Sequence, residues 1–224
     1  MFLSYGKAEI PILFENEFCL VLNKPSGLAV QGGEGVKVSL DSLLAKNYNP
    51  RPLLVHRLDK DTSGIILVAK TKEAASGFSV LLAGKGRSVV KQYVGLCSGV
   101  PEPAQGAIRL EINVRGSEKE AETLYRIVSA AHIGGISCSL LELKLGTGRM
   151  HQIRRHLAGI GHPLLGDDKY GNFSLNKELR KALGLKNLLL HASRLIIPPL
   201  PEFLPLGMDV SAALPEYFSS LAAT

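Results

Sequence analysis

The stretch HRLDKDTSG, residues 56–64, is followed directly by the apolar run Ile65–Ala69. An apolar run of this length, bounded by turn residues, is typical of a buried strand. The stretch therefore places charged and hydroxyl side chains against a future core, where buried charges need partners. Three interpretations follow: a metal-binding loop, a solvated turn, or a loop that holds a carboxylate for chemistry.

The metal-binding interpretation fails on spacing. The order D-x-D-x-S-G that begins at Asp59 matches the start of a calcium-binding loop. The twelfth position of that loop would be Lys70, where a glutamate is required, and a strand instead of a helix is expected next. His151 and His156 are five residues apart and do not have zinc-binding spacing. No metal site is therefore predicted.

The other two interpretations both remain open on the residues alone. A solvated turn explains residues 61–63, whose side chains favour turns. It explains Arg57 and Asp59 less well, because they flank a leucine just after the apolar residues 53–55 and should be partly buried. An aspartate that a neighbouring arginine keeps ionised can act as a nucleophile or a base.

The composition of the chain is that of a soluble globular protein. Of 224 residues, 46% are hydrophobic and 21% charged, and the net charge of +6 is compatible with a polyanionic partner. No apolar run approaches the ~20 residues of a membrane span, and residues 1–18 lack a basic region followed by a long apolar stretch, so no signal peptide is expected. Three widely spaced cysteines without a CxxC pair indicate a reducing compartment, so we expect a cytoplasmic protein without membrane association.

Local patterns predict the elements of the first part of the chain. Residues 18–23 and 64–69 are expected to be strands. Ser39 is expected to cap a helix over residues 40–46. A second helix is expected to begin after Thr71 and to end near Gly84.

The later part of the chain alternates apolar and polar residues, which is typical of half-buried antiparallel strands. Four strands are expected there, over residues 89–96, 107–114, 122–128 and 137–145. A helix over residues 149–160 follows, with the apolar stripe Met150, Ile153, Leu157 and Ile160. A surface helix over residues 174–183, closed by Gly184, and a strand over residues 188–198 complete the pattern.

These elements predict an α+β fold with a mixed, mainly antiparallel β-sheet and flanking helices. The chain shows no internal repeat, no low-complexity tract and no linker. We therefore expect a single domain over residues 1–224.

The motif at residues 56–64 resembles the central motif of the RluA-type RNA pseudouridine synthases. Other segments resemble that family's remaining motifs, in the family's order: Asn23–Leu28, Lys91–Tyr93, Ala121–Tyr125, Gly148–Arg154, Gly161–Asp167 and Leu190–Ala192. The similarity spans roughly residues 17 to 200. Two positions depart from it, because the family usually has Thr or Ser at Met150 and an apolar residue at Arg155.

The resemblance implies the pseudouridine synthase catalytic fold, with an RNA-binding cleft, as a stand-alone catalytic domain without the separate N-terminal RNA-binding domain of some relatives. It implies an isomerase, formally an intramolecular transferase, that converts a specific uridine of ribosomal or transfer RNA to pseudouridine. The reaction detaches uracil from C1′ of the ribose, turns it and rejoins it through C5. Because no redox step occurs, no cofactor is expected, and RNA is the expected partner, with no obligatory protein partner.

The resemblance also implies roles for individual residues. Asp59 is the expected catalytic carboxylate, Tyr93 is expected to cover the uracil and serve in proton transfer, and Arg154 to pair with Asp59. Arg57 is expected to help displace the target base, which is otherwise stacked and inaccessible. Four further cations are expected to contact RNA: Lys24, Lys91, Arg149 and Arg155. Two basic clusters, residues 85–91 and 149–155, are the expected docking face.

Two other classes of protein are consistent with parts of the pattern. A non-catalytic RNA-binding protein would explain the basic charge, but it has no use for a buried carboxylate beside RNA phosphates. A glycosidase could use Asp59 and Asp61 as its acid pair, although in a turn the two side chains diverge. The chain also lacks tryptophan for sugar stacking.

Overall fold

A computed structural model of the chain describes residues 2–5, 8–83, 89–114 and 116–222. The chain divides into two compact units. The first unit comprises Met1–Lys91 and Ala192–Ala213, and the second comprises Gln92–His191 and Leu214–Thr224. Each unit is an α+β structure, as expected, while the single domain over residues 1–224 stays a prediction. Among the described residues, no helix has the length and apolar character that crossing a membrane requires.

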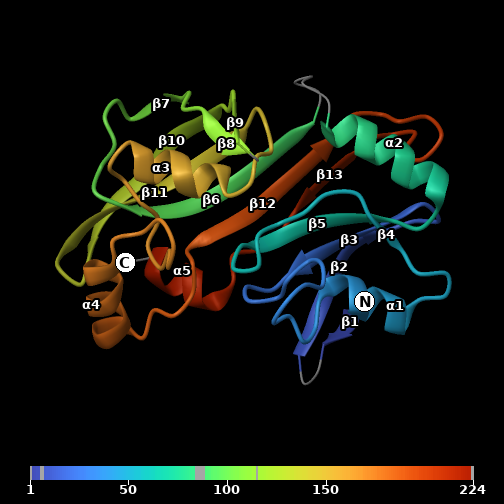
Figure 1. The fold of residues 1–224 in the computed structure, drawn as a ribbon, viewed down its shortest axis with the longest axis horizontal. Helices are drawn as coiled ribbons and strands as arrows, with labels where there is room; N and C mark the ends of the chain where they lie inside the picture. Colours follow the sequence, from blue (N-terminus) through green and yellow to red (C-terminus); the bar gives the residue numbers. More distant parts are fainter. Residues whose placement is uncertain (1, 6–7, 84–88, 115, 223–224) are drawn as a thin grey trace. The chain divides into compact units, whose positions relative to one another are not determined.

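The first unit is a sheet with two helices (Figure 1). Its strands are β1 (Phe2–Tyr5), β2 (Ala8–Glu15), β3 (Cys19–Lys24), β4 (Leu53–Leu54), β5 (Ser63–Ala69), β12 (Leu190–Ile197) and β13 (Met208–Ser211). Its helices are α1 (Leu40–Asn47) and α2 (Lys72–Ala83). The strand order is β1-β2-β3-β5-β12, with β4 beside β5 and β13 beside β12.

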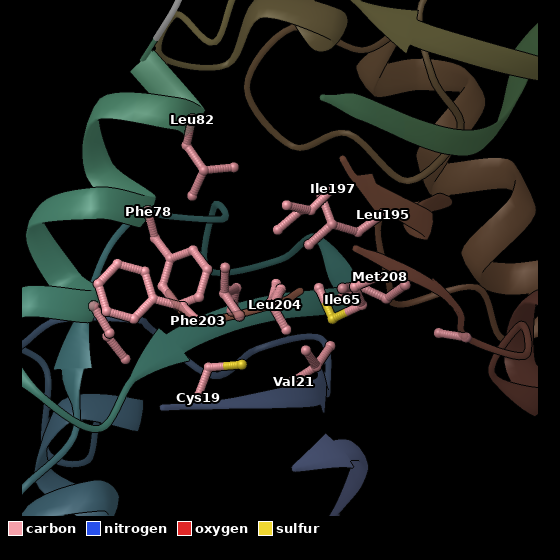
Figure 2. Packing of buried hydrophobic residues seen from close by; sticks show 14 residues of the cluster. Cys19, Val21, Ile65, Phe78, Leu82, Leu195, Ile197, Phe203, Leu204 and Met208 are labelled. Carbon is pink, nitrogen blue, oxygen red and sulfur yellow. The ribbon is translucent and has the colours of Figure 1, made fainter. Parts of the chain in front are cut away.

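Strand β5 lies at the centre of this unit, and all seven of its residues are buried. Because both faces of β5 are covered, its residues from Ile65 to Ala69 are all apolar instead of alternating. Ile65 and Leu67 join a core cluster with Phe78 of α2 and with Phe203. Figure 2 shows the two phenylalanine rings side by side, with their centroids 5.9 Å apart. This core anchors the strand that directly follows the HRLDKDTSG loop.

The second unit contains further strands and three further helices in the described residues. Its strands are β6 (Val90–Ser98), β7 (Gln105–Ile108), β8 (Ile112–Val114), β9 (Ser117–Lys119), β10 (Thr123–Ile133) and β11 (Ile136–Leu145). Its helices are α3 (Gln152–Gly159), α4 (Phe173–Leu183) and α5 (Glu216–Ala222). The strand order is β6-β11-β10-β7, while β8 and β9 form a separate antiparallel pair.

Alternation along β11 assigns the two faces of the sheet in this unit. Leu141 and Leu143 pack with Ile153 and Leu157 of α3, which lies over the sheet (Figure 1). Cys138 instead belongs to the cluster that includes residues of α4 and α5. Side chains two residues apart share a face of a strand, so α3 covers one face and α4 with α5 the other.

Several predicted elements are confirmed. Ser39 caps α1, with its side chain accepting a hydrogen bond from Ser42 N and its own N–H donating to Ser42 Oγ. Thr71 Oγ1 accepts a hydrogen bond from Ala74 N at the start of α2. Gly184 ends α4 in the left-handed conformation, at φ 68°. The expected end of α2 near Gly84 lies outside the described residues.

The single strand expected over residues 107–114 is wrong. The structure has two strands there, β7 and β8, with different partners: β7 pairs with β10 and β8 pairs with β9. Between them, Arg109 forms an ion pair with Glu122, with 2.8 Å between Nε and Oε2. Alternating residues describe a strand but not its partner, so the pattern could not show the break.

The helix expected over residues 149–160 begins only at Gln152, and Met150 is 63% exposed instead of facing the core. The side chain of Gln152 accounts for this delay. Its Oε1 accepts hydrogen bonds from Thr147 Oγ1 at 2.7 Å and from Arg149 N at 3.0 Å, which hold the preceding residues in a turn. The expected apolar stripe therefore starts at Ile153.

Candidate active site

The loop that carries Asp59 runs between β4 and β5, and Asp59 is half-buried. His56 ties the start of this loop to the core, because its Nε2 accepts a hydrogen bond from Leu67 N of β5 at 2.9 Å. Burial lowers the pKa of His56 to about 4, and the charge of Lys91 adds to the effect. The imidazole is therefore neutral near pH 7, which is the form that can accept this hydrogen bond.

A second segment of the first unit clamps the loop directly after the carboxylate. Gly27 N donates a hydrogen bond to Lys60 O at 2.9 Å. Ser26 Oγ donates a hydrogen bond to Asp61 O at 2.7 Å. These bonds fix the backbone of the residues directly after Asp59, so the structure brings the two motifs at residues 23–28 and 56–64 together.

Lys24 supports the same clamp from the inside. It is fully buried, and its Nζ donates hydrogen bonds to three backbone carbonyls, those of Pro25 at 3.0 Å, Leu28 at 2.9 Å and Lys60 at 3.0 Å. Burial lowers the pKa of Lys24 to about 7, which the nearby carboxylates of Asp61 and Asp59 oppose. An ammonium has three N–H groups and all three donate to these carbonyls, so the contacts give the expected RNA contact of Lys24 no support and it stays a prediction.

Gly64 ends the loop at a position that admits no side chain. Its φ is 109°, and a Cβ there would lie 2.2 Å from Ala192 O in β12. The loop therefore enters β5 where the neighbouring strand comes closest, and only glycine satisfies both the backbone conformation and the space.

In the second unit, α3 carries Arg154, which is only 3% exposed. Its Nε donates to Asp167 Oδ2 at 2.8 Å and its Nη2 to Asp167 Oδ1 at 2.7 Å. Burial raises the pKa of Asp167, but hydrogen bonds from Arg154 and from two backbone N–H groups outweigh it and hold the pKa below its ordinary value. This bidentate pair fixes both position and orientation of the guanidinium.

Tyr170 completes the surroundings of Arg154. Its ring centroid lies 5.3 Å from Cζ of Arg154, and its hydroxyl lies 3.0 Å from Nδ1 of His151. Neither Asp167 nor Tyr170 was predicted to have a role, although Asp167 ends a recognised motif. A signal was present in the Asp-x-x-Tyr spacing, but only the structure shows that both residues surround Arg154.

Tyr93 lies on β6 and is half-buried. It packs against the core cluster that contains Ile153 and Leu157 of α3, so it lies on the sheet face that α3 covers. The structure therefore brings Tyr93 to the same side of the second unit as the helix that carries Arg154.

Two of the remaining predicted RNA contacts also bond to the protein itself. Lys91 Nζ donates to Leu82 O at 2.8 Å, and burial lowers the pKa of Lys91. Arg155 is half-buried, and its Nη1 donates to Asn113 O at 3.3 Å. One hydrogen bond each leaves donors for a phosphate, so these contacts stay predictions.

Arg57 and Arg149 are exposed, as a residue that contacts RNA must be. Lys85 and Arg87 of the expected basic cluster lie outside the described residues. In the part of the chain that the structure describes, no group of three His, Cys, Asp or Glu side chains comes together in a way that could hold a metal ion.

A family model described as RNA pseudouridylate synthase matches residues 18–159 of the chain. This range includes the Asp59 loop, Tyr93 and Arg154.

Curated relatives extend the similarity over most of the chain. The "Ribosomal large subunit pseudouridine synthase C" of Haemophilus influenzae is 39% identical over 198 residues, which is 82% of this chain and 59% of that protein. The protein of the same name from Rickettsia felis is 35% identical over 222 residues, 93% of this chain and 68% of that protein. The chain spans only 59–60% of the length of several of these relatives.

Solved structures are similar over almost the full chain. "Human RNA Pseudouridylate Synthase Domain Containing 4" has a TM-score of 0.77 at 28% identity, covering 95% of this chain and 91% of that chain. "Human RNA Pseudouridylate Synthase Domain Containing 1" has a TM-score of 0.69 at 25% identity, covering 96% and 95%. The expected fold class is thereby confirmed.

Proposed function

We propose, from the premise that the chain belongs to the RNA pseudouridylate synthase family, that it isomerises a uridine in RNA to pseudouridine. The observation that carries the proposal is the clamped loop that presents Asp59, since Ser26, Gly27 and the buried Lys24 hold its backbone from one neighbouring segment. The relatives named for the large ribosomal subunit favour ribosomal over transfer RNA as the substrate.

Asp59 supplies the carboxylate for the glycosidic step. In the overall reaction the bond from C1′ to N1 breaks and a bond from C1′ to C5 forms, while C5 loses a proton and N1 gains one. A carboxylate can attack the sugar or the base, or assist elimination, and each route begins with an ionised acid. Since electrons and atoms balance without an oxidant or reductant, the proposal needs no cofactor and no metal.

Arg154 is proposed to pair with Asp59 and to favour its ionised form, because a neighbouring cation opposes the effect of burial on a carboxyl pKa. The pair with Asp167 uses Nε and Nη2 of the guanidinium and fixes its orientation within the second unit. A planar fork can serve two carboxylates in fixed directions, which the single ammonium of lysine cannot.

The other proposed roles concern the RNA. Tyr93 covers the uracil face and serves in proton transfer, and its position on the α3 face of the sheet supports this role. Arg57, which is exposed and lies two residues before Asp59 in the chain, displaces the target base from its stack. Lys91, Arg149 and Arg155 contact phosphates.

The substitution Asp59→Asn tests the proposal. We expect pseudouridine formation to fall by about 10²- to 10⁴-fold, because the amide cannot act as a nucleophile or base. RNA affinity should change by less than about threefold, since phosphate contacts carry most of the binding. The measurement is release of tritium from RNA labelled at C5 of uridine, with affinity measured separately by filter binding.

Asp61→Asn is the matched control, because Asp61 lies two residues away and contributes its backbone carbonyl to the clamp. It should keep near-parental turnover. Binding without isomerisation by the parent protein would instead indicate an RNA-binding protein, and release of free uracil that depends on both aspartates would indicate a glycosidase. Mapping pseudouridines in ribosomal and transfer RNA with and without the gene identifies the substrate.

A further inference from the structure

We propose that Tyr170 is a positioning residue for the isomerisation, which acts by holding the Arg154 guanidinium in the orientation that Asp167 sets. The inference rests on the proposed function, in which Arg154 acts on Asp59. It is carried by three contacts of Tyr170 in the second unit, made by its ring, its backbone N–H and its hydroxyl.

The ring of Tyr170 covers the cation. The ring centroid lies 5.3 Å from Cζ of Arg154, and the ammonium of Lys169 lies 5.5 Å from the same centroid. Arg154 and Asp167 are 3% and 1% exposed, so the ring borders an ion pair that is already removed from water. Attraction between a guanidinium and an aromatic face is strongest under such conditions.

The backbone of Tyr170 is bound to the same carboxylate as the guanidinium. Asp167 Oδ1 accepts hydrogen bonds from the backbone N–H groups of Lys169 and Tyr170, both at 2.9 Å. The turn is tight, because a Cβ at Gly171 would lie 2.2 Å from Asp167 O. The position of the tyrosine is therefore coupled directly to the acceptor that orients Arg154.

The hydroxyl of Tyr170 reaches the start of α3. It lies 3.0 Å from Nδ1 of His151, which occupies the position before the first residue of the helix. His151 has φ 53° and ψ 29°, and it is the one non-glycine residue with positive φ among those described. A left-handed conformation is unfavourable for histidine, so contacts such as this one must maintain it.

These contacts act on Arg154 at both ends, at its guanidinium and at its helix turn. Asp167 holds the tip of Arg154, and the hydroxyl of Tyr170 holds the helix turn from which Arg154 projects, three residues after His151. The ring of Tyr170 covers the guanidinium of Arg154 itself. A side chain that only filled space would not need the hydroxyl contact.

The experiment compares Tyr170→Leu and Tyr170→Phe with Tyr125→Phe as the matched control. Tyr125 also lies in the second unit, and its hydroxyl donates to Pro103 O at 2.9 Å, so the control removes a similar bond that involves neither Arg154 nor His151 nor Asp167. We expect Tyr170→Leu to lower the single-turnover rate at saturating RNA by about 10- to 100-fold, as small misplacements of catalytic groups do. Tyr170→Phe keeps the ring and should recover part of that loss.

RNA affinity should stay within about twofold of the parent in both variants, because the phosphate contacts are unchanged. In an Arg154→Lys background, Tyr170→Leu should cause little additional loss of rate, since a residue that acts through Arg154 has no separate effect once the guanidinium is gone. The proton signal of Arg154 Nε–H should also exchange faster with water in Tyr170→Leu, which requires no activity to measure.

Three results would overturn the inference: a parental saturated rate in Tyr170→Leu, an equal loss in Tyr125→Phe, or a loss of RNA affinity with the rate unchanged. The last would make Tyr170 an RNA contact. Failure of the proposed function is distinct, because the parent protein itself would then release no tritium. In that case the exchange of Arg154 Nε–H alone decides whether Tyr170 orders the guanidinium.

Discussion

Two buried basic residues, Lys24 in the first unit and Arg154 in the second, order their own surroundings at the scale of single residues. Lys24 is satisfied by three backbone carbonyls, and Arg154 by the carboxylate of Asp167. The difference matches their chemistry, because an ammonium donates in three directions whereas a guanidinium presents a planar fork. The bonds of Lys24 therefore fix the backbone of a loop, whereas the bonds of Arg154 fix the direction of its own side chain.

His56 gives a prediction for the dependence of stability on pH. Its pKa is about 4 in the folded state, against an ordinary value of 6.5. Below pH 6.5 the unfolded chain binds a proton that the folded protein does not, so the free energy of unfolding should fall as the pH is lowered from 6.5 towards 4. Protonation removes the acceptor for Leu67 N, which is the physical cause of the loss.

The measurement is urea unfolding of the parent protein and of His56→Gln between about pH 7 and about pH 5. The stability of the variant should vary less with pH over this range. His132→Gln, at an exposed histidine of β10, is the control and should retain the parental dependence. Identical pH profiles for the parent and His56→Gln would contradict the prediction.

At the scale of elements, the entry of the loop into β5 depends on how closely β5 and β12 approach. Gly64 combines a positive φ with a backbone oxygen of Ala192 2.2 Å from where a Cβ would be. A methyl group there cannot be accommodated by turning a flexible side chain, since the obstacle is backbone. The two strands would have to separate.

We therefore expect Gly64→Ala to lower the free energy of unfolding by about 2–4 kcal/mol, from backbone strain and overpacking together. Turnover should also fall, because Asp59 lies in the loop that this glycine ends. The midpoint of urea unfolding measures the stability.

Gly32→Ala is the matched control for Gly64→Ala. A Cβ at Gly32 meets nothing within 4 Å, and its φ is not positive, so the change should stay within about 0.5 kcal/mol. Equal effects of the two substitutions would show that β5 and β12 are not held at this distance in solution.

At the scale of the whole molecule, the net charge of +6 should govern RNA binding. Each phosphate that a lysine or arginine neutralises releases a counterion, so affinity should fall by about 10- to 100-fold between about 50 and 200 mM salt. The slope of log Kd against log salt concentration measures the number of such contacts. Asp59→Asn should leave that slope unchanged, whereas Arg155→Met should reduce it. A flat response would exclude the basic residues as the docking face.

The sequence by itself determined what depends on neighbours along the chain. The Asp59 loop, the cap at Ser39, the start of α2 and the glycine end of α4 were all predicted, because caps, turns and periodicity act within a few residues. The family was also recognisable, since its motifs are short and follow one another in a fixed order.

Only the tertiary structure decided which partners the charged residues take. Lys24 was expected to contact RNA but is buried. The sequence could not show this, because one of its acceptors, Lys60 O, is 36 residues away along the chain. Arg154 bonds to Asp167, 13 residues later, and Met150 is exposed because Gln152 holds the turn before the helix. Such contacts form when separate segments pack together, and no local pattern records the distance between segments that only folding brings together.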